Sequence, residues 1–238
     1  PAVALLSTLE KWGERLKRAH QVPAAAGLPA HPFKFLEPFE AGDARIFFGR
    51  ESEVAELTAL LAAPTVRLVL VFGPCGVGKS SLLRAGLSRA LADEGLPSLV
   101  INAGADPGKR LAEALQTRPE LRVAIVDQLD ELFTLNRPDS PEVRRFLELV
   151  IGLAEDAASP VKVVLSFRPE FRAPLFALET RLARLAQAYA VGPLSEAALA
   201  DAIEGPSFIE LYEFSFEAGF ARALTRDILE TVAERGES

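Results

Sequence analysis

The sequence predicts an α/β fold with three layers: a mostly parallel, five-stranded sheet with helices on both faces, followed by a partial helical region. Three observations lead to this prediction. Short apolar runs rich in Val and Leu alternate with longer stretches of helical periodicity. The strongest run, at residues 66–72, leads directly into a glycine-rich turn, and a helical pattern follows that turn. In parallel sheets of this kind, ligands bind at the carboxyl ends of the strands.

Five apolar runs are the expected strands, at residues 66–72, 97–102, 121–126, 161–167 and 189–191. The expected helices cover residues 51–62, 109–116, 141–156, 169–187 and 196–204, with a further helix that follows the glycine-rich turn and ends before Gly95. Residues 207–235 are expected to be mostly helical after an irregular stretch, SFIELYEFSFEAG.

Three segments are expected along the chain. Residues 1–32 read as an N-terminal helix, at 3–20, and a linker rich in Pro and Ala. Residues 33–193 form the predicted core, and residues 194–238 a helical region that we expect to be truncated. The chain starts at Pro1 without a methionine, so we interpret it as a piece of a larger polypeptide.

The composition excludes several classes of protein. A net charge of −7 argues against general binding to nucleic acids or to anionic membranes. The single cysteine excludes an internal disulfide and fits a reducing compartment. No apolar run approaches the length of a membrane span, and no signal peptide is visible. We therefore expect a cytoplasmic protein that makes no contact with a membrane.

The glycine-rich turn carries a complete G-x-x-x-x-G-K-[ST] pattern. Glycines let backbone N–H groups converge on an anion, and the N-terminus of the following helix adds partial positive charge. Lys79 is placed for the β- and γ-phosphates of a nucleotide, and the Ser80 hydroxyl for Mg²⁺. The pattern predicts a phosphate-binding loop that consists of Gly73, Pro74, Cys75, Gly76, Val77, Gly78, Lys79, Ser80 and Ser81.

Charged residues follow the third and fourth expected strands. Asp127 comes directly after an apolar run and is interpreted as the second Mg²⁺ ligand, beside Ser80. A carboxylate three residues later can activate a water near the γ-phosphate, so Asp130 is the first candidate for the catalytic base and Glu131 the second. Arg168 follows the fourth strand and is the candidate sensor of the γ-phosphate.

Two further positions stay open on the residues alone. Phe48, Gly49 and Arg50 precede the helix at 51–62, and they fit either core packing with a turn or a lid over the adenine. Cys75 occupies a permissive position of the loop, where alkylation is expected to block nucleotide binding.

Taken in order, five pieces of the sequence resemble the STAND class of signal-transducing NTPases, which are relatives of AAA+ proteins. The pieces are FLEPFEAGDARIFFGRESEV, GPCGVGKSSLLRAGL, VDQLDELF, VVLSFRPEF and PLSEAALADAIEGP. The likeness is greatest to the bacterial novel-STAND branch often found beside WD-repeat propellers. VDQLDELF is also similar to the D-G-x-D-E run of NACHT-type STAND proteins. The resemblance covers about residues 33–206 and implies a P-loop NTPase of the AAA+/STAND type.

The resemblance also implies roles for individual residues. These are Mg²⁺ binding by Asp127, hydrolytic assistance from Asp130, γ-phosphate sensing by Arg168, and an adenine end framed by Phe48, Gly49, Arg50 and Pro206. Two positions depart from the pattern of the branch, which usually has a glutamate at Asp130 and a serine at Cys75. After Pro206 the sequence fits the pattern less well.

The function that the resemblance implies is a switch. ADP holds the protein closed; exchange for ATP opens it and promotes self-association into a homo-oligomer, so that an effector domain can act. Adjoining effector and repeat-sensor domains are expected in the same polypeptide, and hydrolysis is expected to be slow.

Other nucleotide-binding classes fit the sequence less well. A GTPase would need N-K-x-D and D-x-x-G, and a transporter ATPase an LSGGQ-like signature; none of them is present. A small-molecule kinase would usually lack the DQLDEL acid cluster and carry an Arg-rich lid. The non-enzymatic alternative is a scaffold that binds ATP tightly and does not hydrolyse it.

Overall fold

The structure is a computed structural model that describes residues 28–29, 31–212 and 214–236. The described chain forms two compact units, Ser52–Gly192 and a second unit that joins the residues up to Glu51 with those from Pro193 onward. The helix expected at 3–20 lies outside the described residues. The division of the chain into segments 1–32, 33–193 and 194–238 remains a prediction.

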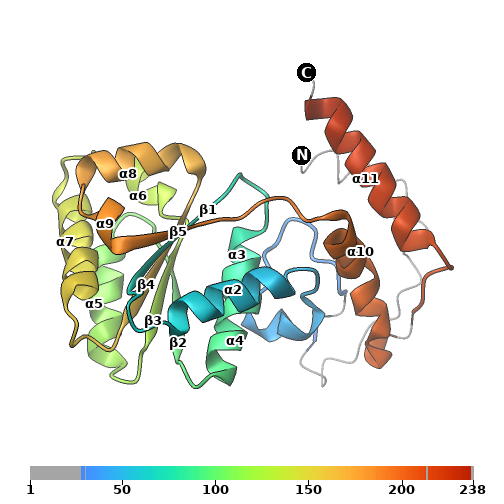
Figure 1. The fold of residues 1–238 in the computed structure, drawn as a ribbon, viewed down its shortest axis with the longest axis horizontal. Coiled ribbons are helices and arrows are strands. Elements are labelled where there is room, and N and C mark those ends of the chain that lie inside the picture. Colours follow the sequence, from blue (N-terminus) through green and yellow to red (C-terminus); the bar gives the residue numbers. More distant parts are fainter. Residues whose placement is uncertain (1–27, 30, 213, 237–238) are drawn as a thin grey trace. The chain divides into compact units, whose positions relative to one another are not determined.

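The unit Ser52–Gly192 is built on one five-stranded sheet, with the strand order β2-β3-β4-β1-β5. All four pairings are parallel, which confirms the predicted sheet. Figure 1 shows α3 and α4 on one face of this sheet and α5 and α7 on the other. The strands are β1 (Leu68–Phe72), β2 (Ser98–Asn102), β3 (Val123–Asp127), β4 (Lys162–Phe167) and β5 (Ala186–Ala190).

The helices of this unit follow the predicted pattern closely, and two of them begin at a side-chain cap. Ser140 accepts a hydrogen bond from the Val143 amide, as a serine before Pro141 favours, and Asp106 caps α5 through the Lys109 amide. The helices are α2 (Glu51–Ala62), α3 (Lys79–Ser81), α4 (Ser88–Asp93), α5 (Pro107–Thr117), α6 (Asp130–Leu135), α7 (Pro141–Glu155), α8 (Arg172–Leu178) and α9 (Leu182–Leu185).

The helix after the glycine-rich loop contains a π-helical segment, Leu82–Leu87, between α3 and α4. The Ser88 hydroxyl donates a hydrogen bond to the Leu83 carbonyl within this wider turn, at 2.8 Å. The apolar face expected from the sequence is fully buried, at Leu82, Leu83, Leu87 and Leu91. One continuous helical run thus leads from the loop across the sheet, as predicted.

Side chains of the sheet alternate between its two faces. Leu165 and Phe167 of β4 belong to a large apolar cluster with side chains of α5, α7 and α8. Ser166, which lies between them on β4, therefore points to the opposite face, which the helical run after the loop covers (Figure 1). Burial of strands on both faces explains why the strand sequences are apolar almost throughout.

The fifth strand differs from its predicted bounds. β5 covers Ala186–Ala190, whereas the apolar pattern predicted residues 189–191 and a helical pair that extends to residue 187. The strand lies at an edge of the sheet, and most of its residues are exposed, so its sequence AQAYA has no strong strand pattern. Pairing with β1 determines its bounds. The helical pair correspondingly begins as a 3-10 turn, Pro169–Phe171, and ends with α9.

The other unit is mostly helical. Its elements are the 3-10 helices Ala41–Ile46, Gly205–Phe208 and Glu210–Tyr212, and the helices α10 (Glu196–Glu204) and α11 (Phe220–Gly236). Two small apolar clusters stabilise it, one around Ile46 and Tyr212 and one between α10 and α11. After the stretch predicted to be irregular, the long helix begins at Phe220. Among the described residues, no helix has the length and apolar character needed to span a membrane.

Candidate functional site

The glycine-rich loop joins β1 to α3 and has a conformation that requires glycine at two positions. Gly76 and Gly78 have φ angles of +77° and +93°, a backbone region in which side chains are strained. Gly78 is also the residue before the first turn of α3. Pro74 and Cys75 are exposed, so the loop presents its backbone to solvent, as a phosphate-binding loop must.

Gly73, the first residue of the loop, is required for a different reason. A Cβ atom at this position would lie 2.4 Å from the Val191 carbonyl oxygen. The Val191 amide in turn donates a hydrogen bond to the Phe72 carbonyl at 2.8 Å. The chain that leaves β5 therefore packs directly on the base of the loop, a contact that the sequence pattern does not reveal because it depends on strand pairing.

The Lys79 ammonium lies at the centre of the predicted site. It donates hydrogen bonds to two carbonyls of the loop, at 2.6 Å to Gly73 and 3.0 Å to Pro74. Partial burial lowers the pKa of Lys79 below its usual value, while the negative charges of Asp130 and Asp127 act to raise this pKa. These two carboxylates therefore lie close enough to interact with the ammonium, so the structure brings the three predicted residues together.

Asp127 ends β3 and is almost fully buried, with 1% of its side chain exposed. Its Oδ1 accepts a hydrogen bond from the Gln128 amide at 2.9 Å, and its Oδ2 lies 3.3 Å from an Arg84 guanidinium nitrogen. Arg84 also donates to the Asn102 side chain at the end of β2, at 2.5 Å. Arg84 and Asn102 were not predicted, because they come from a helix and a neighbouring strand without a shared motif.

The chain turns sharply after Asp127. Gln128 has a φ of +57°, a left-handed conformation that costs a non-glycine residue roughly 1–2 kcal/mol. This is the position at which the similar D-G-x-D-E run has glycine, and the backbone conformation explains that preference. The turn lets the Leu129 amide bond to the Ser166 carbonyl at 2.8 Å, and α6 then begins at Asp130.

The two charged groups predicted for hydrolysis and sensing form an ion pair. The Arg168 Nε donates to the Asp130 carboxylate at 3.1 Å. Arg168 also lies 3.5 Å from the Glu170 carboxylate, and its guanidinium is stacked over the Phe171 ring at 5.1 Å from the ring centre. Asp130 and Arg168 thus restrain each other next to Lys79, whose pKa both of them influence.

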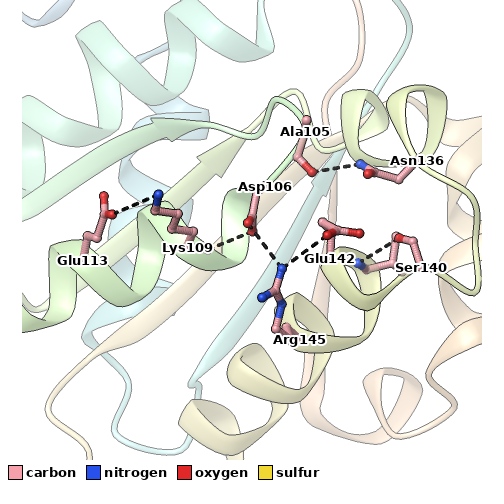
Figure 2. A network of polar contacts seen from close by, with 9 residues as sticks. Ala105, Asp106, Lys109, Glu113, Asn136, Ser140, Glu142 and Arg145 are labelled. Carbon is pink, nitrogen blue, oxygen red and sulfur yellow. Dashed lines mark hydrogen bonds and ion pairs between the residues drawn. The ribbon is translucent and has the colours of Figure 1, made fainter.

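Glu131, the second candidate base, has a different partner from Asp130. Its carboxylate accepts a hydrogen bond from the Gly104 amide at 2.9 Å. At the other end of α6, the Asn136 amide group donates to the Ala105 carbonyl at 2.9 Å, as Figure 2 shows. The loop after β2 therefore holds α6 at both ends, which restricts the orientation of Asp130.

The same loop is linked to α7 by a network of polar contacts (Figure 2). The Asp106 carboxylate lies 3.5 Å from Arg145, whose guanidinium is also 3.4 Å from Glu142. Lys109 and Glu113 form an exposed pair on α5 at 3.9 Å. Exposed pairs of this kind each contribute little to stability, about 0–1 kcal/mol. We interpret the network as a set of contacts that orients the loop after β2. The network lies outside the predicted site.

The donor groups near Lys79 fit a magnesium ion that binds together with a nucleotide. No group of three or more His, Cys, Asp and Glu that could hold a metal by itself occurs in the described part of the chain. Mg²⁺ at nucleotide sites needs only one or two carboxylates, because phosphates and waters complete its shell. The buried Asp127 carboxylate and the half-buried Ser80, at the start of α3, provide oxygen ligands of the required type.

Four residues that the resemblance assigns to the adenine end belong to the other unit: Phe48, Gly49, Arg50 and Pro206. Phe48 and Gly49 pack against α10 and the residue that follows it. A Cβ at Gly205 would lie 2.3 Å from the Phe48 ring, so this ring rests on the Gly205–Pro206 backbone. A Cβ at Gly49 would lie 2.2 Å from the Ala198 carbonyl oxygen. Arg50 is buried, with 5% exposed. Their role at an adenine stays a prediction.

The exposed Cys75 offers a direct probe of the loop. It is the only cysteine of the chain, so a thiol reagent labels one position. We expect alkylation to prevent nucleotide binding, because Cys75 lies within the loop proposed to hold the phosphates. Bound nucleotide should conversely slow the labelling. Mass spectrometry of the labelled fraction with and without ADP measures this protection, and an equal labelling rate in both samples contradicts it.

Comparison with known proteins supports the fold and places the chain in a family. A chain of the HORMA:CdnC:Trip13 complex of E. coli MS115-1 is similar with a TM-score of 0.53 and 15% identity, over 76% of this chain and 73% of that one. Two Hsp104 structures from S. cerevisiae have TM-scores of 0.52. The Hsp104–ADP complex is 17% identical over 69% of this chain and 25% of the Hsp104 chain. The Hsp104:casein complex in its extended conformation is 15% identical over 78% of this chain and 38% of the Hsp104 chain.

At these identities the similarity shows the fold alone, which this chain shares with those structures. This chain spans well under half of the length of either Hsp104 chain. No curated protein matches the sequence. The family described as nSTAND1, Novel STAND NTPase 1, matches residues 32–237, which is most of the chain. The protein therefore belongs to the novel STAND NTPases, a family of nucleotide-binding NTPases, as the resemblance of its motifs predicted.

Proposed function

We propose that this chain binds ADP and ATP together with Mg²⁺, hydrolyses ATP slowly, and acts as a nucleotide-dependent switch. The observation that carries the proposal is the convergence of Asp127, Asp130 and Arg168 on the Lys79 ammonium. All four groups follow the carboxyl ends of strands in one parallel sheet, where ligands of α/β proteins bind. Membership in an NTPase family supports the same conclusion.

Binding requires Lys79 to change partners. Its ammonium now donates to the carbonyls of Gly73 and Pro74, and phosphate oxygens would take their place. Because partial burial disfavours the charged ammonium, a triphosphate restores interactions that burial has removed. The backbone amides around Gly76 and Gly78 and the N-terminus of the helical run add further donors for the phosphates.

Ser80 and Asp127 would hold the metal ion. When bound, Mg²⁺ neutralises part of the negative charge on the phosphates. The Gln128 amide orients the Asp127 carboxylate through its Oδ1. Arg84 supplies a positive charge on the other oxygen of this carboxylate, so the buried acid has a counter-ion when no metal is bound.

We propose that Arg168 reports the γ-phosphate. When no γ-phosphate is present, the Arg168 guanidinium pairs with the Asp130 carboxylate at 3.1 Å, and the two groups restrain each other. A γ-phosphate attracts the guanidinium through charge-assisted hydrogen bonds and releases Asp130. The Asp130 carboxylate can then accept a proton from the attacking water. ADP provides no such partner, so the ion pair distinguishes the two nucleotides and biases a two-state arrangement.

The finer parts of the switch are proposals as well. We propose that the ATP state favours a homo-oligomer and that adjoining effector and repeat-sensor domains in the same polypeptide provide output and input. The branch of the STAND class that the sequence resembles supports this proposal, and similar chains in the solved structures occur within complexes.

The switch predicts a change of size with the nucleotide. We expect the chain to remain monomeric with Mg²⁺ and ADP and to form a larger species with Mg²⁺ and a non-hydrolysable ATP analogue. Size-exclusion chromatography with light scattering measures the mass in both conditions. Lys79→Ala is the control, because it should keep the smaller mass with either nucleotide. Equal mass of the unaltered chain in both conditions contradicts the proposal that ATP promotes self-association.

A further inference from the structure

Ser166 has a buried hydroxyl for which no role has been described so far. The side chain is fully buried, with 0% exposed. Its Oγ has no hydrogen-bond partner among the residues that the structure describes. A buried hydroxyl without a partner is unfavourable, so alanine would be the more stable choice for packing alone. Thr225 likewise lacks a hydrogen-bond partner among the described residues, so it is the position of Ser166 in the sheet, beside Asp127, that points to a partner from outside the chain.

The register of the sheet places Ser166 next to Asp127. Ser166 pairs with Val71 on β1, and its neighbour Leu165 pairs with Val126 on β3. One step further along the same register brings Asp127 beside Ser166. The Leu129 amide, just after the turn, also bonds to the Ser166 carbonyl, which fixes this end of β4 against β3.

Both side chains point to the same face of the sheet. Phe167 packs into the cluster with α5, α7 and α8, so the adjacent Ser166 faces the other way. Asp127 contacts Arg84 of the helical run after the glycine-rich loop, and this run covers that same face. The hydroxyl thus lies between the end of β1, which carries the loop, and the carboxylate proposed to hold the metal.

We propose that Ser166 is a further residue of the nucleotide–metal site, and that its hydroxyl hydrogen-bonds a water of the Mg²⁺ shell held by Asp127. The inference rests on the proposed function. Mg²⁺ at nucleotide sites keeps several waters, and each such water requires polar partners. The two Asp127 oxygens already have contacts, with the Gln128 amide and with Arg84. Ser166 provides a hydroxyl on the neighbouring strand β4, on the side of Asp127 that faces β1 and the loop.

The test removes the hydroxyl and measures binding with and without the metal. Ser166→Ala should leave the melting temperature of the nucleotide-free chain unchanged or raise it, because it removes a buried hydroxyl that lacks a partner. With Mg²⁺, its affinity for a non-hydrolysable ATP analogue should fall roughly threefold to tenfold, the value of one hydrogen bond. In excess EDTA, Ser166→Ala and the unaltered chain should bind the analogue equally.

Thr225→Val is the matched control. Thr225 also has a fully buried hydroxyl that lacks a partner among the described residues, and it lies in α11 of the other unit. This variant should match Ser166→Ala in thermal stability but keep full affinity with Mg²⁺.

Two results overturn the inference: equal affinity of Ser166→Ala and the unaltered chain with Mg²⁺, or an equal loss with and without the metal. Failure of the unaltered chain to bind nucleotide at all would instead refute the proposed function.

Discussion

Replacing Lys79 by alanine is expected to abolish nucleotide binding. The ammonium is the cation at the centre of the site, and two charge-assisted hydrogen bonds to phosphate oxygens are worth roughly 1.5–3 kcal/mol each. Their loss should weaken the binding of ADP and ATP by about 10²-fold or more. Calorimetric titration with Mg²⁺ and ADP measures the change. The fold should persist, because the Lys79 side chain is partly buried at a cost to its charge.

Lys109→Ala provides the matched control for this variant. It removes the same charge from the same unit, but Lys109 is exposed on α5 and pairs only weakly with Glu113 (Figure 2). Its affinity for ADP should equal that of the unaltered chain. Micromolar binding by Lys79→Ala would show that the loop is not the phosphate site, and an equal loss in both variants would show a general charge effect.

The second large effect is expected from Asp130→Asn. The amide cannot accept a proton from water, so the release of phosphate in a single turnover should slow by roughly 10²-fold or more. Nucleotide binding should persist, since neither Lys79 nor Asp127 changes. The variant also removes the negative charge that pairs with Arg168, so ATP should bind at least as tightly as before relative to ADP. Rapid-quench measurement of phosphate, next to the titration, separates the two effects.

Glu131→Gln tests the alternative base. Glu131 accepts a hydrogen bond from the Gly104 amide, which the side-chain oxygen of glutamine can also accept, so the variant should keep α6 in place and change the rate of hydrolysis little. Asp130 has no role in hydrolysis if Asp130→Asn releases phosphate at the rate of the unaltered chain. A rate loss confined to Glu131→Gln would assign the base to Glu131. No phosphate release from the unaltered chain would favour a scaffold that binds without turnover.

Much of the fold could be predicted from the sequence because its signals are local. The strands are buried on both faces and hence apolar, and the loop requires Gly76 and Gly78 for its backbone conformation. The caps at Ser140 and Ser195 follow the same kind of local chemistry. The family pattern of the motifs was confirmed by the match to residues 32–237.

The surroundings of the predicted residues could not be predicted, since they depend on how distant segments pair. Arg84 and Ser166 reach the vicinity of Asp127 only through the order and register of the strands. β5 was predicted at the wrong residues because an edge strand of small, half-exposed side chains has little pattern of its own. The left-handed turn at Gln128 occurs at a residue that rarely adopts it, so composition provides no signal.

The strand order has a consequence for synthesis and truncation of the protein. β1 pairs with β4 and β5, so Leu68 finds its neighbours only at Val163 and Ala186. While the chain emerges from the ribosome, the strand LVLVF therefore has no partner on either edge until β4 and β5 have been made. An apolar strand in that condition is prone to aggregate. Shortened versions of this chain should stay soluble only if they extend through Ala190.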